Sequence, residues 1–219
     1  MIEIYTGHQI QADHALSKEL FSFRFEVAVG EMGWDLPNAS SSMDRDEFDL
    51  PNTIHIIDRA TSGKILGVSR LNSMAGPNLM RDIFPNYCAP NRLPQTDSCL
   101  EHSRFLAKRK GLSTTEYMKV LGRLLLAVHE YALHTSVTRI SSLTYMTHYN
   151  LAVRLFKARP LGLPKVYSED GNMYLAFTCS VNEAGIMNTR RYTNISNPQI
   201  TMRHVLDLSF HNRKKVVAA

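Results

Sequence analysis

The chain has 219 residues, of which 44% are hydrophobic and 21% are charged. This composition is typical of a globular protein with a core of its own, and it excludes disordered and fibrous classes. The formal charge of +5 selects no partner by itself, and three widely spaced cysteines give neither a disulfide framework nor a CxxC zinc pair. Because no signal peptide and no run of ~18 apolar residues is visible, we expect a cytoplasmic protein without membrane insertion.

The first part of the chain alternates between strand and helix patterns. Residues 2–6 predict a short strand, and apolar residues at helical spacing predict a helix over 12–29. Residues 35–52 are polar and irregular, which is typical of an active-site loop. Strand-like runs at 53–58 and 65–71, joined by a Thr-Ser-Gly turn signal, predict a hairpin.

The middle of the chain carries the clearest helix signal. Residues 72–98 are rich in proline and glycine and predict a loop with one short helix, and residues 99–107 predict a strand. The run from Ser113 to Glu116 is a capping box, which predicts the start of a long amphipathic helix.

The last part repeats the alternation with shorter elements. We expect a strand over 140–146, a short helix over 150–159 that ends at a proline, and two strands at 166–167 and 174–181 around an Asp-Gly turn. Residues 183–219 predict a mixed or helical tail. The alternation favours an α/β fold of three layers, in which helices cover a mixed sheet.

We expect residues 1–219 to form a single domain with a mobile loop at 35–52. Within it, five charged residues interrupt strands or the polar loop: Asp46, Asp49, Arg70, Glu101 and Arg104. Each one alone is explained by an ordinary surface salt bridge, yet charge inside a sheet is costly unless it is paired or functional. Together they suit a zwitterionic ligand with an amine and a carboxylate. A regular strand places Glu101 and Arg104 on opposite faces, so a shared site requires a bulge between them.

Other motifs carry less information. The basic turn at 108–113 leads into the capped helix and is either a phosphate site or an ordinary turn. His129, Glu130 and His134 have HExxxH spacing, which does not fit a zincin, and we expect no metal site. The sequence contains no GxSxG, P-loop or GxGxxG motif. Cys99 is interpreted as a buried structural thiol.

An ordered series of residues resembles the LuxI-type acyl-homoserine-lactone synthases, also called autoinducer synthases. The series consists of Arg24, Trp34, Asp46-Glu47-Phe48-Asp49, Arg70, Phe84 and Glu101-His102-Ser103-Arg104-Phe105. Order and spacing fit over residues 20–106, and the pattern is compatible to about residue 165. Three departures concern the pocket's shape more than its chemistry: Ala28 in place of Phe, Asp44 in place of Glu, and Cys99-Leu100 where a Trp is frequent before the glutamate.

The resemblance implies a GNAT-like fold with splayed central strands. It also implies an enzyme of quorum sensing that joins an acyl group to S-adenosylmethionine, forms the lactone and releases methylthioadenosine. S-adenosylmethionine is then a substrate, no cofactor is permanently bound, and the acyl donor is a thioester of acyl carrier protein or CoA. The resemblance assigns catalytic roles to Glu101 as general base and to Arg70, Asp46 and Asp49 as a charged network.

The resemblance also assigns binding roles. The substrate-binding residues are Arg24, Trp34, Phe84, Ser103, Arg104, Phe105 and Thr144, the last of which is implied in acyl-chain selection. A basic group would dock the acidic carrier protein: Arg154, Lys157, Arg159 and Lys165. Such a group is also consistent with a merely solvated surface.

Two other readings stay open from the sequence. A CoA-dependent GNAT acyltransferase would carry a Q/R-x-x-G-x-G/A signature, which only residues 108–113 approximate. A nucleic-acid-binding regulator would use Arg190-Arg191 and the basic tail at 211–215, but no helix-turn-helix, RNP motif or zinc finger accompanies them, so we expect no nucleic-acid partner. Ala28 is a hint of a third reading, an inactive homologue.

Overall fold

The computed structural model of the chain describes residues 1–36, 42–167 and 171–205. Within these residues, eight strands form one mixed sheet in the order β1-β2-β3-β4-β5-β8-β6, with β7 also paired to β8. The strands are β1 (Ile2–Thr6), β2 (Ile54–Arg59), β3 (Ile65–Ser73), β4 (Cys99–Ala107), β5 (Arg139–Tyr145), β6 (Arg159–Pro160), β7 (Lys165–Val166) and β8 (Met173–Ser180).

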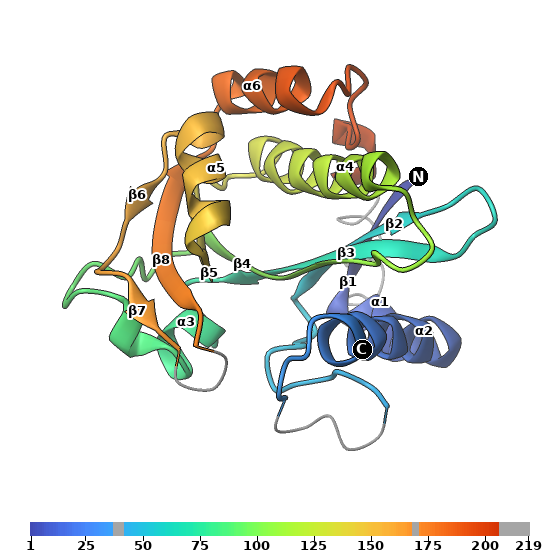
Figure 1. The fold of residues 1–219 in the computed structure, drawn as a ribbon, viewed down its shortest axis with the longest axis horizontal. Coiled ribbons are helices and arrows are strands. Elements are labelled where there is room, and N and C mark those ends of the chain that lie inside the picture. Colours follow the sequence, from blue (N-terminus) through green and yellow to red (C-terminus); the bar gives the residue numbers. More distant parts are fainter. Residues whose placement is uncertain (37–41, 168–170, 206–219) are drawn as a thin grey trace, which may run out of the picture.

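Helices cover both faces of the sheet (Figure 1). They are α1 (Gly7–Ala12), α2 (His14–Phe25), a π-helix η1 (Glu26–Glu31), α3 (Leu79–Asp82), a 3-10 turn η2 (Pro85–Tyr87), α4 (Thr114–Leu133), α5 (Met146–Phe156) and α6 (Glu183–Thr193). Neighbouring residues of a strand face opposite sides, so Ile56 joins the core beneath α4 with Leu124, while Ile57 joins the core beneath α2 with Leu20. The predicted three-layer α/β architecture is confirmed.

Several predicted elements match closely. The strands at 2–6 and 99–107 have the predicted bounds, and β2 and β3 form the predicted hairpin. At the start of α4, the Ser113 hydroxyl accepts from the Glu116 N–H at 3.3 Å and the Glu116 carboxylate accepts from the Ser113 N–H at 2.8 Å. These reciprocal bonds are the predicted capping box.

Other predicted elements need correction. The helix predicted over 12–29 begins two residues later, because Asp13 is extended and caps α2. Its C-terminal part is the π-helix η1 instead of an α-helix. The helix predicted over 150–159 begins at Met146 and ends at Phe156, because Lys157 has a left-handed backbone (φ 56°). The short strand β6 then follows, which the sequence did not indicate. The basic tail at 211–215 and Asp170 of the predicted turn lie outside the described residues.

The two central strands separate, and this opening places the site. Strands β4 and β5 run parallel and pair only from Cys99–Arg139 to Glu101–Ser141, although both strands continue. The pairing of β4 with β3 also shifts register between Ser103 and Leu106, and Arg104 has a left-handed backbone (φ 49°). A bulge is therefore present, but it lies at Arg104 itself and just after it.

Candidate active site

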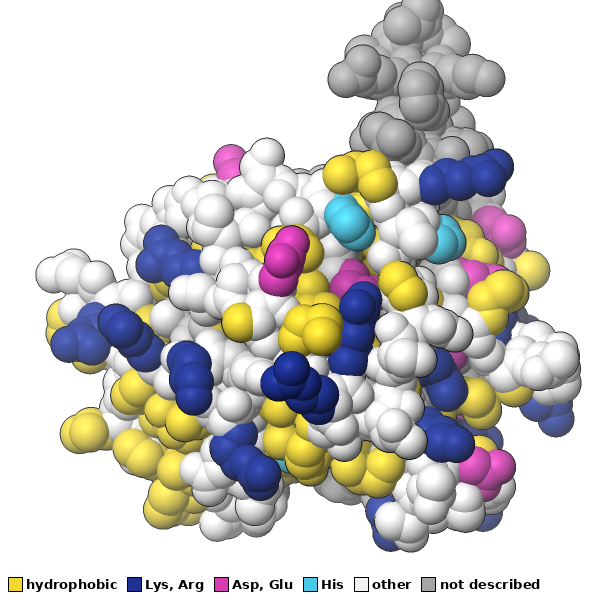
Figure 2. Space-filling view, turned by 90° about the horizontal axis from the view of Figure 1, so that it is seen from above, with side chains coloured by type: hydrophobic (Ala, Val, Ile, Leu, Met, Phe, Trp, Pro, Cys, Tyr) yellow, Lys and Arg dark blue, Asp and Glu magenta, His cyan; other side chains and the backbone are white. Residues whose placement is uncertain are grey.

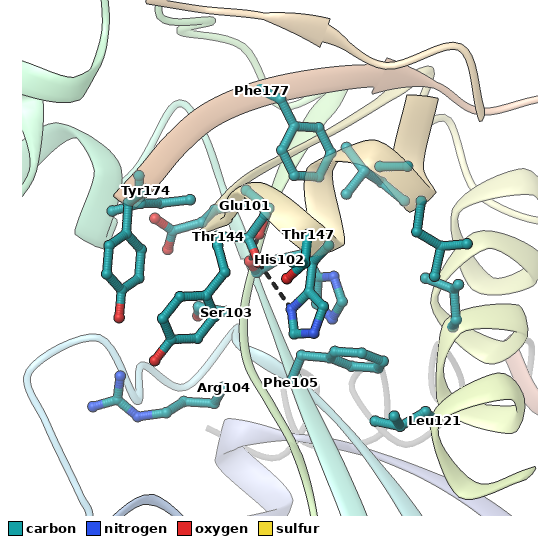
Figure 3. Close-up of a pocket in the computed structure, with 18 of the residues that line it drawn as sticks. Glu101, His102, Ser103, Arg104, Phe105, Leu121, Thr144, Thr147, Tyr174 and Phe177 are labelled. Carbon is teal, nitrogen blue, oxygen red and sulfur yellow. Dashed lines mark hydrogen bonds between the residues drawn. The ribbon is translucent and has the colours of Figure 1, made fainter. Parts of the chain in front are cut away.

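A cavity of about 610 Å³ occupies the opening between β4 and β5. Figure 3 shows Glu101, Ser103 and Arg104 toward one end of this cavity and Phe105, Leu121 and Phe177 toward the other. The remaining wall comes mainly from α4, α5 and β8 and from the segment at 32–36. One cavity thus joins a charged region to a long apolar region, which suits a polar acceptor and an acyl chain.

Glu101 is a carboxylate of the cavity wall that is buried and held by backbone amides. It is 1% exposed, and its two oxygens accept from the Met80 N–H at 2.6 Å and the Leu79 N–H at 3.2 Å. These amides belong to the first turn of α3, which begins after Asn78. Burial raises the pKa of Glu101, although the two amides and Arg70 oppose that shift. A carboxylate with a raised pKa inside a cavity is a candidate general base.

Behind the cavity, three arginines and three aspartates alternate in a closed ring. Each guanidinium donates to two carboxylates, in the order Arg24, Asp44, Arg104, Asp46, Arg70, Asp49 and back to Arg24. The contacts of Arg24 are 3.0 Å to Asp44 and 2.7 Å to Asp49, and those of Arg104 are 2.7 Å to Asp44 and 2.9 Å to Asp46. The ring is formally neutral, and within the described residues only Arg24 Nη2 and Arg70 Nη2 of its guanidinium nitrogens are buried without a hydrogen-bond partner.

The ring ties the 42–49 segment to the sheet and to α2. Burial alone would raise the pKa of Asp49, but Arg24 and Arg70 hold it well below its usual range, and Arg24 and Arg104 do the same for Asp44. The neighbouring His55 is buried, which lowers its pKa to about 3. His55 is therefore neutral and adds no charge to the ring.

The structure separates the predicted site residues into two groups. Glu101, Ser103, Arg104, Phe105, Trp34, Phe84 and Thr144 line the cavity. Four others are members of the ring and do not line the described cavity: Arg24, Arg70, Asp46 and Asp49. The Arg24 side chain is 1% exposed and is held by two aspartates, and its predicted role in shaping the pocket stays a prediction. Arg104, at 10% exposure, is the ring member that itself lines the described cavity.

Aromatic and hydroxyl side chains complete the polar end. The Trp34 indole N–H donates to the Tyr145 hydroxyl at 3.3 Å and thereby joins the N-terminal layer to the end of β5. Phe84 packs edge-on against Tyr87 and Tyr167. The Ser103 hydroxyl accepts from the Arg70 guanidinium at 3.0 Å, so the ring also orients this residue of the wall.

Two buried histidines line the apolar part of the cavity. Burial lowers the pKa of His102 to about 3 and that of His129 to about 4, so both are neutral at ordinary pH. His129 stacks on Phe156 with ring centroids 3.6 Å apart, and its Nε2 lies 3.8 Å from the Cys179 sulfur. These rings act as apolar surface with one polar edge. The sequence placed His102 in the family series and His129 in the HExxxH spacing, but it assigned neither residue to the cavity.

The sequence also missed Asp44 as a partner of Arg24 and Arg104. The sequence carried a signal for Asp44, because the family it resembles commonly has a glutamate at this position. The closed ring of charges is visible only in the structure. Met80 was missed for a different reason: it acts through its backbone N–H, which any residue type supplies.

The remaining predictions concern surfaces and ions. The four basic residues of the predicted docking group are all exposed: Arg154, Lys157, Arg159 and Lys165. The turn at 108–113 is not an open phosphate site, because its amides already donate to a carboxylate of η1. In the part of the chain that the structure describes, no group of three metal-binding side chains is found, and no helix is long and apolar enough to cross a membrane.

Comparisons with known proteins agree with this picture. The model of the autoinducer synthase family matches residues 8–158. An acyl-homoserine-lactone synthase of Ralstonia nicotianae is 29% identical over 147 residues, which cover 65% of this chain and 70% of that protein. The structure of TofI in a ternary complex with an inhibitor and MTA superposes with a TM-score of 0.71 at 24% identity, covering 86% of this chain and 96% of TofI.

A further structure has the same fold. BjaI, a CoA-dependent acyl-homoserine lactone synthase solved with SAM and isopentyl-CoA, superposes with a TM-score of 0.76 at 19% identity, covering 90% of this chain and 91% of BjaI.

The mixed sheet with splayed central strands and the cavity between them define a GNAT-like fold. The family match covers more than half of the chain. The chain belongs to the autoinducer synthase family, and its function is that of an acyl-homoserine-lactone synthase in quorum sensing.

Proposed function

We propose that the chain transfers an acyl group from a thioester to the α-amine of S-adenosylmethionine, and that Glu101 is the general base. The observation that carries the proposal is the buried Glu101 carboxylate in the cavity wall, held by two amides and with a raised pKa. The complexes of TofI with MTA and of BjaI with SAM and isopentyl-CoA support this choice of substrates.

The first step forms an amide. Glu101 takes a proton from the substrate amine, directly or through a water, and the amine nitrogen attacks the thioester carbonyl carbon. The new carbon–nitrogen bond replaces the carbon–sulfur bond, and the thiol of the donor leaves with the proton. A base held in position contributes about 10²–10⁴ to the rate.

The second step closes the lactone. The carboxylate of the acylated S-adenosylmethionine attacks its own γ-carbon, the bond from that carbon to the sulfonium sulfur breaks, and methylthioadenosine leaves. No proton is transferred and the sulfonium is already a good leaving group, so holding the chain in a folded conformation suffices.

The other side chains position these groups. We assign the S-adenosylmethionine end of the cavity to Trp34, Phe84, Ser103 and Arg104, and the start of the acyl region to Phe105 and Thr144. The four ring residues that lie off the cavity wall, Arg24, Arg70, Asp46 and Asp49, position Arg104 and Ser103 rather than touch the substrate. The Thr144 hydroxyl lies 3.3 Å from His148 Nδ1, and this hydrogen bond fixes the orientation of the hydroxyl.

The reaction needs two substrates and no permanently bound cofactor. We propose that the enzyme is cytoplasmic, where it would have access to both substrates. The exposed group of Arg154, Lys157, Arg159 and Lys165 suits an acidic carrier protein as donor, because surfaces of opposite charge accelerate encounter.

The proposal is tested by incubating the purified chain with S-adenosylmethionine and a panel of acyl thioesters, and by measuring lactone and methylthioadenosine with mass spectrometry. The wild type is expected to produce both in equal amounts, and Glu101→Gln is expected to lose nearly all of this activity. Glu116→Gln serves as the matched control, because Glu116 is an exposed cap of α4. Acylation without methylthioadenosine would contradict the proposal and indicate an ordinary N-acyltransferase.

A further inference from the structure

His102 combines a buried side chain with a place in the cavity wall. It follows Glu101 on β4 and is 8% exposed, and its ring packs edge-on against Phe105 with centroids 5.1 Å apart. Figure 3 shows His102 near the middle of the cavity, with Thr144 and Thr147 on one side and Phe105 on the other. The residue therefore lies where the charged end of the cavity passes into the apolar region.

The helices that enclose the apolar region bring no charge into it. Helices α4, α5 and α6 contribute no Lys, Arg, Asp or Glu side chain to the described cavity wall. Figure 2 shows the outer face of this layer, on which Lys and Arg side chains lie among hydrophobic ones. A polar atom of His102 that faces the cavity therefore meets the substrate chain rather than a charged side chain of these helices.

Two neutral histidines line this region, and their hydrogen bonds differ. Burial lowers the pKa of both His102 and His129, so each ring has one N–H donor and one acceptor nitrogen at ordinary pH. His129 uses both, because its Nδ1–H donates to the Leu125 carbonyl at 3.0 Å and its Nε2 faces the Cys179 thiol at 3.8 Å. His102 Nε2 is bonded to the Ser69 hydroxyl at 3.2 Å. Within the described residues, His102 Nδ1 forms no hydrogen bond, and because this atom is not enclosed by protein it is reached from the cavity.

The Ser69 hydroxyl decides what His102 Nδ1 offers to a ligand. Ser69 is 1% exposed, and in the described part of the chain its hydroxyl has no second hydrogen-bond partner. When the hydroxyl donates to Nε2, the ring proton is on Nδ1, which then donates into the cavity. When the hydroxyl accepts from the Nε2–H, Nδ1 is an acceptor. The pair thus serves either a carbonyl or a hydroxyl oxygen, whereas a plain hydrocarbon chain leaves Nδ1 unsatisfied and is disfavoured.

The position of His102 on β4 fixes the part of the acyl chain that it meets. Glu101 and Ser141 are the last pair between β4 and β5, so His102 is the first residue beyond it, where the strands begin to separate. The Ser142 hydroxyl donates to the His102 carbonyl oxygen at 2.8 Å and holds β5 at this point. Because neighbouring residues of a strand face opposite sides, Glu101 faces the acceptor amine and His102 faces the chain that has just passed between the strands. His102 therefore meets the first few carbons after the thioester carbonyl.

We propose that His102 selects an acyl chain that carries an oxygen at carbon 3, as a 3-oxo or 3-hydroxy group, through a hydrogen bond at its Nδ1. The inference rests on the proposed function and names the substrate class of that same cavity. It differs from the role that the resemblance implies for Thr144, because the Thr144 hydroxyl is already bonded to His148.

The test uses acyl-pantetheine thioesters of one chain length that are unsubstituted, 3-oxo or 3-hydroxy. Pairs of these donors compete for the enzyme in the presence of S-adenosylmethionine, and the ratio of the two lactones, measured by mass spectrometry, gives the ratio of their kcat/KM values. The wild type is expected to prefer an oxygenated donor by about three- to tenfold, the contribution of one neutral hydrogen bond. Separate 3-oxo and 3-hydroxy arms show which oxygen is bound, and equal use of all three donors would overturn the inference.

Three variants assign the preference to a side chain. His102→Phe combined with Ser69→Ala removes both partners of the buried hydrogen bond, keeps an aromatic ring and is expected to abolish the preference. Ser69→Ala alone keeps Nδ1 and is expected to retain it. His129→Phe is the matched control with an unchanged ratio, because that ring stacks on Phe156 and both of its nitrogens already have partners. A preference that survives in the double variant would overturn the inference, and its loss in Thr144→Val would then assign it to Thr144.

A binding measurement separates this inference from the proposed function. Calorimetry measures the binding of the three thioesters without S-adenosylmethionine, so that no lactone forms. Tighter binding of an oxygenated donor to the wild type, absent from the double variant, is expected whether or not the chain makes lactone. Loss of lactone formation with every donor would contradict the proposed function, and equal binding of the three donors to the wild type would contradict only the selection by His102.

Discussion

Removing Arg24 tests the closed ring of charges. Arg24→Met keeps most of the side chain's length and deletes two charge-assisted hydrogen bonds, at 3.0 Å to Asp44 and 2.7 Å to Asp49. Such bonds contribute about 1.5–3 kcal/mol each. Removal of one partner from a buried ion pair costs about 3–5 kcal/mol in total. We therefore expect the free energy of unfolding to fall by about 3–5 kcal/mol at neutral pH.

The loss should also depend on pH with a defined sign. The folded-state pKa of Asp44 and Asp49 is lowered, so their stabilisation is present above the ordinary carboxyl pKa of about 3.9 and disappears as the pH falls toward the lowered value. Without Arg24, burial favours the protonated acids, so the difference between wild type and variant narrows on acidification.

Urea unfolding followed by circular dichroism measures the difference in the free energy of unfolding between wild type and Arg24→Met. The measurement is repeated at several pH values from 7 down to the lowest pH at which both proteins are folded. Lys108→Met is the control, because Lys108 belongs to an exposed pair whose loss costs about 0–1 kcal/mol. A loss below about 1 kcal/mol for Arg24→Met, or a loss that does not change with pH, would refute the reasoning about the ring.

Three further predictions concern single residues. Trp34→Ala removes the ring and the hydrogen bond to Tyr145, so steady-state kinetics should show KM for S-adenosylmethionine raised by roughly tenfold, with a smaller effect for Trp34→Phe; equal effects would contradict the role of the ring. Gly7→Ala places a Cβ 1.8 Å from the Leu50 carbonyl oxygen, and urea unfolding should show a loss of about 1–3 kcal/mol; wild-type stability would contradict this contact. His102 is held neutral by burial, so its imidazole NMR signals should stay constant from pH 8 to about 5; a titration in that range would contradict the burial.

Local signals explain why much of the fold was predictable. Apolar alternation and spacing predict β1, β4 and α4, and the capping box fixes the start of α4. The boundaries of α5 depend instead on tertiary contacts and on the left-handed backbone of Lys157, which carries no glycine signal. The π-helical turn at the end of α2 has no recognisable pattern in the sequence, and its acids matter only because they face the turn before α4.

The candidate site was predictable as a set of residues but not as an arrangement. Spacing and resemblance identified Glu101 and Arg104, and the requirement for a bulge followed from strand geometry. The division between the ring and the cavity wall was not readable, because it depends on which partner each guanidinium meets in space. The cradle of Glu101 is made of backbone amides, and backbone groups leave no trace in the residue types.

The central claim is that Glu101 is the base, and the rate of acyl transfer as a function of pH tests it most directly. Single-turnover rates measured with S-adenosylmethionine bound should fall on the acid side as the carboxylate is protonated, at a pH above the ordinary glutamate pKa of about 4.3. Glu101→Gln should lower the rate by about 10²–10⁴ and remove this acid limb, while S-adenosylmethionine still binds. A variant that keeps the acid limb, or reacts within about tenfold of the wild type, would contradict the account.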